Sequence, residues 1–265
     1  MSIDVTIEAG ICTIVINRPE RLNALDADHY RDLSAAWRQV RDDAAIRVAI
    51  VTGAGERSFT TGADIKSFLT APPGYDEMWL TQRDQLLNRG LEVWKPVIAA
   101  VNGYCLGGGV TMLLATDIRV ASENATFNLA EVKRGVVAGN GGTQRILDQL
   151  PYPIAMEMLL TGDPIDAATA ARWGLINKVV PRDKLMAAAH EYAERIAANA
   201  PLAVQAAKEL AVQAAKELAV RSRDMDLATG LRFEAVINRM LLSTEDAKEG
   251  PAAFAEKRAP NFKGN

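Results

Sequence analysis

Three apolar runs, each closed by small or polar turn residues, restrict the fold of this chain most strongly. They are VAIVTGAG at 48–55, PVIAAVNG at 96–103 and TDIRVAS at 116–122. A run without polar alternation suits a strand that is buried on both faces, as strands in parallel sheets are. Such strands are joined by helices, so we expect an α/β fold.

The segments around these runs continue the alternation of strands and helices. Residues 3–17 alternate as a hairpin that turns at 9–10, and the loop NRPERLNALD leads into a helix over about 26–41. The stretch 70–78 carries two prolines and a glycine, which favours a mobile loop before a helix at about 77–91.

The C-terminal third is rich in alanine and other strong helix formers. Helices are predicted over 183–198 and, after a break at Asn199-Ala-Pro201, onward to about residue 242. At 265 residues the chain has room for one large domain with an appendage. We therefore divide it into a core, residues 1–198, and a helical C-terminal subdomain, residues 199–265.

The helical part contains an exact repeat: VQAAKELA at 204–211 is followed at once by the same eight residues at 212–219. An insertion of this length adds about 2.2 turns of helix and rotates the downstream chain by ~80°. We interpret the repeat as a tandem duplication without chemistry, which disturbs downstream packing unless a loop absorbs it.

Charge and cysteine content exclude several classes of protein. The net charge is −3, the pI is about 5.6, and the basic residues are dispersed among acids, so no nucleic acid partner is expected. Cys12 and Cys105 lie in apolar runs and are expected to be buried and reduced, without zinc. The N-terminus lacks signal-peptide features and no run approaches ~18 apolar residues, so we expect a soluble, cytoplasmic protein without membrane contact.

Histidine chemistry is also unexpected. The chain holds only His29 and His190, and both fall in predicted polar surface helices. A Ser-His-Asp site is therefore improbable.

A first segment with potential chemistry is SFTTGADIKSF at 58–68. A glycine follows a strand-like run there and precedes Ala63, Asp64 and Lys66. The segment could be an ordinary turn from strand to helix, because Asp64 could simply cap the helix.

A second segment is NGYCLGGGVTMLLATDI at 102–118, where a buried strand runs into Gly107, Gly108 and Gly109 and then a short apolar helix. Backbone N–H groups at a helix start, free of side chains, bind an oxyanion. A phosphate loop is the rival, but no G-K-[ST] follows and the spacing G-x-G-x-x-G is absent. The glycines therefore favour oxyanion chemistry.

The third segment is ATFNLAEVKRGVVAGNGGTQRI at 125–146. Glu131 sits among apolar residues, where a carboxyl group is expected to have the raised pKa that a general acid or base requires. The alternative is a salt bridge from Glu131 to Lys133 or Arg134. The loop after it offers small residues and helix-start amides, which would also suit close packing.

Taken together and in this order, these segments resemble the crotonase superfamily, the enoyl-CoA hydratases and isomerases. Its successive landmarks are matched over nearly the whole chain by NRPERLNAL, TGADIK, KPVIAAVNGYCLGGG, the EVKRG…GGTQR stretch, TGDPIDAATAARWGLINKVVP and FAEKRAPNFKG. The resemblance implies a crotonase-like spiral of ββα turns with a C-terminal helical trimerisation subdomain, assembled as a homotrimer or hexamer. It also implies acyl-CoA thioester substrates, with coenzyme A as part of the substrate, no permanently bound cofactor and no metal.

The resemblance carries over to individual residues. Ala63 and Gly108 match the two positions whose amides form the oxyanion hole, and Glu131 matches a catalytic carboxylate. The matched substrate- and CoA-binding positions are Arg21, Ala24, Asp64, Ile65, Lys66, Gly139, Phe254 and Lys257.

These binding positions have different implied roles. Arg21 and Ala24 belong to the loop that meets the adenine end, and Lys66 resembles the lysine near the CoA phosphates. Gly139 falls where a backbone amide holds water or an acyl group. Phe254 and Lys257 resemble residues that cover CoA bound to a neighbouring subunit.

Thr111 departs from the pattern of the hydratases, which place a second glutamate at this position. A threonine hydroxyl can orient water but cannot act as a general base near pH 7. A single carboxylate suits the isomerisation of 3-enoyl-CoA to 2-enoyl-CoA or hydratase/lyase-like chemistry. The alternatives are a plain 2-enoyl-CoA hydratase, a hydrolase or decarboxylase, and a catalytically silent acyl-CoA- or RNA-binding relative.

Overall fold

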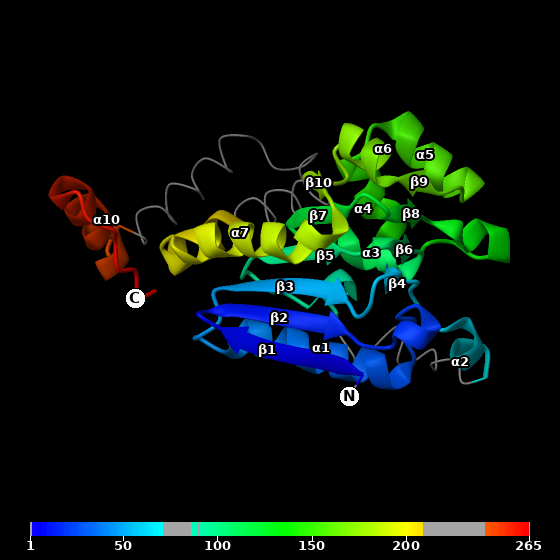
Figure 1. The fold of residues 1–265 in the computed structure, drawn as a ribbon, viewed down its shortest axis with the longest axis horizontal. Coiled ribbons are helices and arrows are strands. Elements are labelled where there is room, and N and C mark those ends of the chain that lie inside the picture. The colour runs from blue at the N-terminus through cyan, green and yellow to red at the C-terminus, as the bar shows by residue number, and fades with distance from the viewer. Residues whose placement is uncertain (1, 71–85, 90, 209–241, 265) are drawn as a thin grey trace, which may run out of the picture. The chain divides into compact units, whose positions relative to one another are not determined.

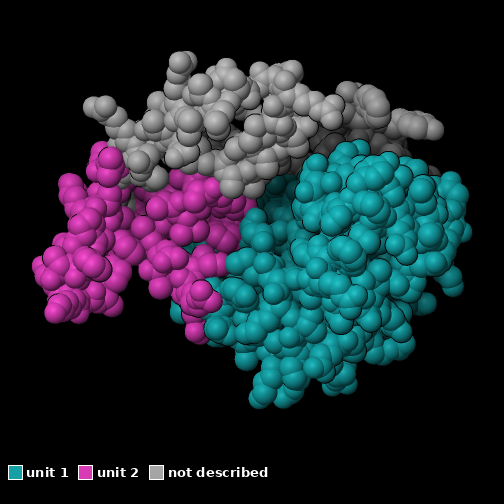
Figure 2. Space-filling model, turned by 90° about the horizontal axis from the view of Figure 1, so that it is seen from above, with its two compact units in different colours: residues 1–93, 97–193 teal, residues 94–96, 194–265 magenta. Residues whose placement is uncertain are grey.

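The computed structural model describes residues 2–70, 86–89, 91–208 and 242–264 (Figure 1). Two compact units are present, which Figure 2 colours separately: residues 1–93 with 97–193, and residues 94–96 with 194–265. The loop predicted from residue 71 on and the repeat beyond residue 208 lie outside the described residues. The domain boundary at residue 198 stays a prediction.

The first unit contains a six-stranded sheet (Figure 1). Its order is β1-β2-β3-β5-β7-β10, and only the β1–β2 pair is antiparallel. Every residue of β3 and β5 is buried, which confirms the expectation drawn from their apolar runs. The strands are β1 (Ile3–Glu8), β2 (Ile11–Ile16), β3 (Val48–Gly53), β5 (Val97–Val101), β7 (Ile118–Ser122) and β10 (Lys178–Val180).

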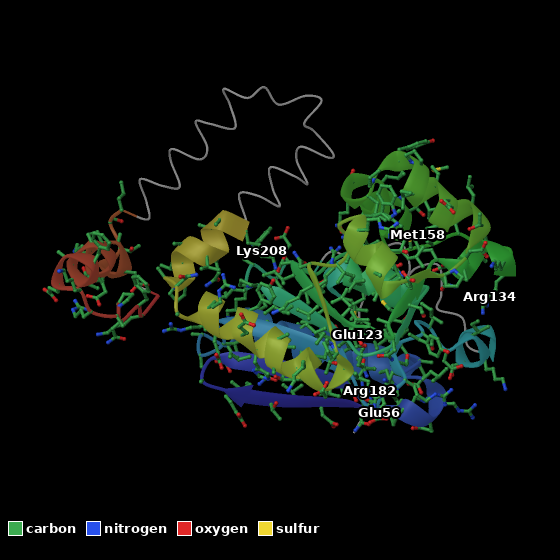
Figure 3. All side chains as sticks on the ribbon, turned by 45° about the horizontal axis from the view of Figure 1, so that its top comes forward. Glu56, Glu123, Arg134, Met158, Arg182 and Lys208 are labelled. Atoms are coloured by element: carbon green, nitrogen blue, oxygen red, sulfur yellow. The ribbon has the colours of Figure 1, made fainter. Side chains whose placement is uncertain are left out.

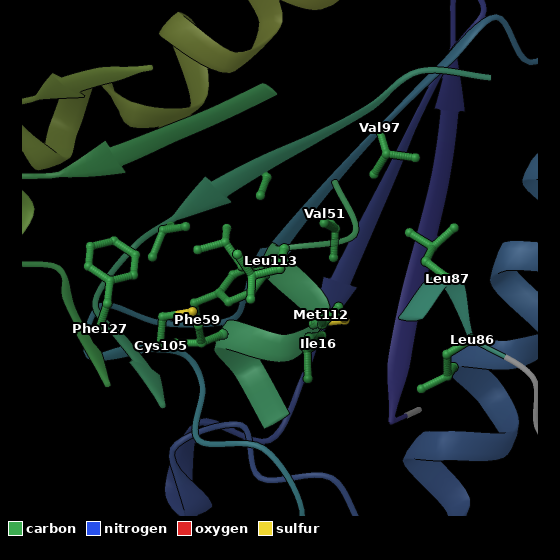
Figure 4. Close-up of a cluster of buried hydrophobic side chains, with 14 of the residues drawn as sticks. Ile16, Val51, Phe59, Leu86, Leu87, Val97, Cys105, Met112, Leu113 and Phe127 are labelled. Atoms are coloured by element: carbon green, nitrogen blue, oxygen red, sulfur yellow. The ribbon is translucent and has the colours of Figure 1, made fainter. Parts of the chain in front are cut away.

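A four-stranded sheet of very short strands completes the core. Its order is β4 (Ser58–Thr60), β6 (Tyr104–Leu106), β8 (Thr126–Asn128) and β9 (Ile165–Asp166). The central residues Phe59, Cys105 and Phe127 are fully buried. They gather with Met112 and Leu113 of α3 (Gly108–Leu113) in one apolar cluster (Figure 4). This packing fixes the ends of the short strands, where the polar groups of interest lie.

The two sheets are built by a repeated ββα turn. In three successive repeats, β3–β4–α2, β5–β6–α3 and β7–β8–η4, one strand joins the large sheet and the next joins the small sheet. The expected α/β spiral is thereby confirmed. Because each repeat ends at the same side of the small sheet, the loops after β4, β6 and β8 are brought together.

The predicted hairpin and the helices predicted over 26–41 and 183–198 are present, with small differences at their ends. The hairpin turns at Ala9 and Gly10, and Asp26 accepts a hydrogen bond from the His29 amide at 3.1 Å to begin α1. The elements are η1 (Pro19–Arg21), α1 (Ala27–Asp42), α2 (Ile65–Thr70), η3 (Leu87–Arg89), η4 (Ala130–Arg134), α4 (Gly142–Gln149), α5 (Tyr152–Thr161), α6 (Ala167–Arg172), η5 (Arg182–Lys184), α7 (Leu185–Ala197) and α10 (Glu245–Glu256). Residues 201–208 are also helical.

The α-helix expected over 77–91 is not observed in the part of that range that the structure describes. Residues 87–89 form a 3₁₀ turn, η3, and residues 77–85 lie outside the described part. Leu86 and Leu87 are adjacent in sequence and both buried. Short 3₁₀ turns such as η3 are common as connectors between longer elements.

The prediction for His29 is wrong. His29 is only 6% exposed, and its Nδ1 lies 2.6 Å from Asp26 Oδ1. It shares the helix spacing of Leu33, Trp37 and Val40, which form the buried face of α1 against β1 and β2. The position in the helical period, rather than the polar neighbours in sequence, decides its burial. Cys12 and Cys105 are buried and free, as predicted.

Surface contacts add detail to the first unit. Arg182 pairs with Glu56, so η5 is tied to the turn between β3 and β4; the two labelled side chains lie together in Figure 3. No helix among the described residues has the length and apolar character needed to span a bilayer.

The second unit includes α10 and the tail after it. Asp246 is buried and accepts the amide N–H groups of Lys263 and Gly264, each at 2.7 Å. The Arg258 guanidinium and the Asn261 amide bind Glu249 and lower the pKa of this carboxyl to about 2. The tail is therefore fastened to α10 by two carboxylates.

Candidate active site

The backbones of Ala63 and Gly108, the two residues matched to the family's amide positions, lie side by side. A Cβ atom at Gly62 would lie 2.6 Å from the amide nitrogen of Gly108, and one at Gly108 would lie 3.5 Å from the amide nitrogen of Ala63. Only glycine permits this approach, and Gly62 also has a φ of +78°. The loop after β4 and the start of α3 thus place two amides next to each other.

Neither of these amides is used internally. Within the described residues, no hydrogen bond is donated by the N–H of Ala63 or of Gly108. The amide of the preceding residue, Gly107, donates to Asn128 O at 2.9 Å, so that neighbour is occupied. Two free donors at this spacing suit an oxygen on which negative charge develops.

A parallel β-bridge holds the loop that carries Ala63. Leu25 N donates to Gly62 O at 2.8 Å, and Asp64 N donates to Leu25 O at 2.8 Å. In such a bridge the central residue, Ala63, directs its own N–H away from the partner strand. Leu25, in the loop before α1, therefore orients the N–H group of Ala63.

Glu131 faces the second loop of this site. It lies in η4, and its Oε1 is 3.3 Å from the place that a Cβ at Gly107 would occupy. Its Oε2 is buried without a hydrogen-bond partner among the described residues. Burial raises the pKa of this carboxyl, against smaller opposing effects of a backbone hydrogen bond and of the Arg134 charge.

The alternative salt bridge for Glu131 is absent from the described structure. Lys133 pairs with Asp163 at 2.6 Å, and Arg134, labelled in Figure 3, donates from Nη1 to Ala130 O at 3.3 Å. With both basic neighbours engaged elsewhere, Glu131 is left free to meet another group.

Thr111 lies against the first turn of α4. Thr111 is buried in α3, and its Oγ1 lies 2.6 Å from the place of a Cβ at Gly142, the first residue of α4. Gly142 N donates to the exposed Gly139 O at 3.0 Å. The structure therefore connects Thr111 and Gly139 through the first turn of α4.

Asp64 does cap a helix, in agreement with the simpler alternative. Its Oδ1 accepts the Lys66 amide at 3.1 Å at the start of α2, and its Oδ2 accepts Arg18 Nη1 at 2.9 Å. Burial opposes ionisation, but these hydrogen bonds lower the pKa of Asp64 overall. Ile65 and Lys66, the next two residues, are exposed.

Comparison with known proteins identifies the family. The family described as Enoyl-CoA hydratase/isomerase matches residues 6–265. A relative named (E)-benzylidenesuccinyl-CoA hydratase, from Thauera aromatica, is 44% identical over the full length of both chains. The chain belongs to the enoyl-CoA hydratase/isomerase family.

Other members of this family agree in sequence and in fold. The carnitinyl-CoA dehydratase of Proteus mirabilis is 40% identical and covers 99% of this chain and 98% of its own. A crystal structure of an enoyl-CoA hydratase from Mycobacterium marinum has a TM-score of 0.88 at 38% identity, over 100% of this chain and 99% of that one. The protein is thus an acyl-CoA enzyme of the crotonase superfamily, with relatives named as hydratases and dehydratases.

The remaining matched positions of the family fall in both units. Arg21 ends η1 and is exposed, and Ala24 N donates to Arg21 O at 3.1 Å in the same loop. Phe254, which is 86% exposed, lies in α10, and Lys257 is the C-cap residue directly after that helix; both belong to the second unit. Their role in covering CoA stays a prediction.

Sequence reasoning missed the residues that support the loop carrying Ala63. Arg18 reaches Asp64, and Asn23 donates from Nδ2 to Ser58 O at 2.7 Å. Thr60 lies next to both loops and is fully buried. The available signal was polar residues inside otherwise apolar or turn segments, NRPERLNAL and SFTTG, since buried polar groups need partners.

No resident metal is indicated in the described part of the chain, where no group of three or more His, Cys, Asp or Glu side chains could bind a metal ion. Arg119 is a strongly enclosed cation near the core. It donates to carbonyl groups, including Leu175 O at 3.2 Å, and burial lowers its pKa to about 10. Its hydrogen bonds satisfy carbonyl groups of the surrounding chain.

Proposed function

We propose that this enzyme stabilises the enolate of a CoA thioester at the Ala63 and Gly108 amides, with Glu131 as its single carboxylate base. The observation that carries the proposal is the pair of free amides together with the Glu131 carboxyl group, whose Oε1 lies against Gly107 and whose buried Oε2 has no hydrogen-bond partner among the described residues. Removal of one such donor typically costs roughly 10²–10³ in rate. Both donors here belong to the main chain, so the geometry of the two loops supplies this contribution to the rate.

The reaction we favour is reversible hydration of a 2-enoyl-CoA, because the similar proteins are named as a hydratase and a dehydratase. Glu131 takes a proton from water as the water oxygen bonds to Cβ. The electrons of the double bond move to the thioester oxygen, which the two amides hold. Glu131 then returns that proton to Cα, so one carboxyl group serves both steps.

Thr111 supports a second candidate reaction. With a hydroxyl at this position, Glu131 is the one carboxyl group that we place at the site. A single base can take a proton from Cα of a 3-enoyl-CoA and return it to Cγ. Isomerisation therefore uses the same enolate site without any activated water, and the Thr111 hydroxyl would matter only for hydration.

The acyl group is proposed to lie against the loop after Glu131. Val136 and Val137 are 59% and 76% exposed, and Val136 N donates to Glu131 O at 3.2 Å. Exposed apolar side chains beside a reactive carboxyl favour an apolar acyl group. The CoA part is proposed to follow Asp64, Ile65 and Lys66 at α2, with Arg21 and Ala24 toward its adenine end.

The decisive experiment supplies 2-enoyl-CoA and 3-enoyl-CoA in deuterated water and identifies products by mass spectrometry. Hydration should give a 3-hydroxyacyl-CoA with deuterium at Cα. Glu131→Gln should lower the rate by roughly 10²–10⁴ while the affinity for free CoA is kept. Turnover undiminished in Glu131→Gln would remove Glu131 from the mechanism.

Thr111→Val separates the two reactions, because valine keeps the shape and loses the hydroxyl. Hydration should fall while isomerisation of 3-enoyl-CoA is retained. Loss of both reactions to the same extent would show that the substitution damages the enolate site instead. A protein that retains RNA in a salt-dependent gel shift and binds no acyl-CoA would contradict the enzymatic proposal altogether.

A further inference from the structure

Thr60 contacts both halves of the oxyanion site, although it lies outside the residues that match the family's site positions. It is the last residue of β4 and is fully buried. Its hydroxyl donates to Asn23 O at 2.6 Å and accepts the amide of Gly62 at 3.1 Å. A hydroxyl has one proton to donate, so its orientation is fixed by Asn23 and its lone pair is directed to Gly62.

Gly62 is the residue whose carbonyl shares a peptide plane with the Ala63 N–H. Its N–H is held by Thr60, and its carbonyl accepts Leu25 N at 2.8 Å. A trans peptide is planar, so the N–H of Ala63 points opposite to the carbonyl of Gly62. Two hydrogen bonds on either side of Gly62 therefore set the direction of the first oxyanion donor.

The start of α3, which carries the second amide, contacts the backbone carbonyl and the methyl group of Thr60. A Cβ atom at Gly109 would lie 2.4 Å from Thr60 O and 3.1 Å from Thr60 Cγ2. Gly109 follows Gly108 in the first turn of α3. Thr60 thus lies between the loop that carries Ala63 and the helix start that carries Gly108. Its side chain and its backbone carbonyl set the spacing between them.

We propose that Thr60 is a positioning residue for the reaction, whose hydroxyl holds the Gly62–Ala63 peptide in the orientation that stabilises the enolate. The inference rests on the proposed function, since it requires these amides to be the oxyanion donors. Misplacement of reacting groups by about 1 Å can cost ~10² in rate. The effect belongs to the chemical step and not to CoA binding, because Thr60 is buried.

Three variants test the proposal. Thr60→Val keeps the side-chain shape and removes the hydroxyl, and Thr60→Ser keeps the hydroxyl and removes the methyl group. Thr52→Val is the matched control: Thr52 is buried in β3, and its hydroxyl donates to Ala100 O at 2.8 Å. It loses a comparable buried hydrogen bond without contact to the oxyanion loop.

The measurements are kcat and KM with the thioester that the wild-type protein turns over, and the affinity for free CoA. Thr60→Val should lower kcat by roughly 10–100-fold with KM and CoA affinity nearly unchanged, as expected for an interaction that acts in the transition state. Thr60→Ser should recover most of kcat, and Thr52→Val should keep it. Equal kcat in Thr60→Val and Thr52→Val would overturn the proposal.

Amide hydrogen exchange of the peptide covering residues 61–65 provides a readout that does not depend on turnover. Exchange should quicken by about tenfold in Thr60→Val and remain near wild type in Thr60→Ser and Thr52→Val. Unchanged exchange would overturn the positioning role whatever the activity. Absence of thioester turnover and of CoA binding in the wild-type protein would instead refute the proposed function, and the catalytic role of Thr60 with it.

Thr60→Ala is the second variant should Thr60→Val not fold, because the smaller side chain fits without new contacts. The same loss of kcat and quickening of exchange are expected from it. Wild-type values for both in Thr60→Ala would count against the proposal.

Discussion

The two oxygens of the Glu131 carboxyl group lie in unequal surroundings. Oε1 lies against Gly107, whereas Oε2 is buried without a partner in the described residues. Burial raises the pKa, and the Arg134 charge opposes this only in part. The residue therefore remains protonated to a higher pH than an ordinary glutamate, whose pKa is about 4.3.

The pH dependence of the rate depends on this shift. A base must be ionised, so kcat/KM should fall as the pH decreases through the raised pKa of Glu131, with the midpoint above about 4.3. A rate profile with 2-enoyl-CoA between pH 4 and pH 9 measures the midpoint. An acid limb at or below the ordinary range, in a protein that is still folded, would contradict the role of burial.

The same shift affects stability in the opposite sense from a usual carboxylate. A pKa raised in the folded state means that the neutral form stabilises the fold, fully below the unfolded pKa, and that this contribution is lost as the pH rises through the folded pKa. Glu131→Gln should therefore unfold in urea at a higher midpoint than wild type at neutral pH. The difference between the two proteins should vanish near pH 4.

At the scale of elements, the site depends on the close approach of the β4–α2 loop to α3. Gly62 lies at that approach with positive φ, and Gly174 has a nearly equal φ of +80° with open space around it. A Cβ costs about 1–2 kcal/mol at either position because of the backbone conformation alone. Only at Gly62 would it also meet the amide nitrogen of Gly108, at 2.6 Å.

The pair Gly62→Ala and Gly174→Ala separates these two effects. Gly174→Ala should lose about 1–2 kcal/mol of unfolding free energy, and Gly62→Ala should lose more, because its Cβ also meets the backbone of Gly108. Only Gly62→Ala should also lose at least ~10² in kcat, since the loss of one oxyanion donor costs that much. Urea unfolding and steady-state rates measure both quantities, and a fully active Gly62→Ala protein would argue against this pair of amides.

Arg18 links two helix starts. Its Nη1 lies 2.9 Å from Asp64 at the start of α2 and 3.3 Å from Asp26 at the start of α1. The pKa of Asp64 is lowered overall, so its ion pair contributes stability above the unfolded pKa and loses it as the pH falls through the folded pKa. The network links the loop before α1 to the loop that carries Ala63.

Two substitutions of Asp64 distinguish the ion pair from the cap. An asparagine side chain can still cap α2, so Asp64→Asn should lose only the pairing, whereas Asp64→Ala should cost about 1 kcal/mol more. Urea unfolding at several pH values measures both effects, and the difference between wild type and Asp64→Asn should disappear in acid. Equal stability of the asparagine and alanine variants would show that the cap contributes nothing.

Elements were predictable from the sequence more reliably than distances were. The apolar runs of β3 and β5 and the glycines at the start of α3 determine local structure, because burial and backbone freedom are properties of short segments. The partners of Thr60 could not be predicted, since Asn23 is 37 residues away and only the fold brings them together. His29 was misjudged because burial depends on its place in the helical period.

For the whole molecule, the residues proposed for the site fall in different compact units. Ala63, Gly108 and Glu131 belong to the first unit, and Phe254 and Lys257 belong to the second. A phenylalanine that is 86% exposed is unusual unless another surface or a ligand covers it. We expect a homotrimer or hexamer in which α10 covers CoA bound to a neighbouring subunit, and light scattering of the purified protein measures the assembly.

Mixed assemblies test whether Phe254 serves a neighbouring subunit. Phe254→Ala alone should keep kcat and stability and raise KM about tenfold, the equivalent of about 1.4 kcal/mol of lost contact with the substrate. Coexpression with Glu131→Gln should restore a low-KM component, because the intact Phe254 of the inactive subunits would cover the competent sites. Coexpression with the double variant, Glu131→Gln and Phe254→Ala, is the control and should restore nothing. If KM stays raised in both mixtures, Phe254 acts on its own subunit, and the α10 contact is intramolecular.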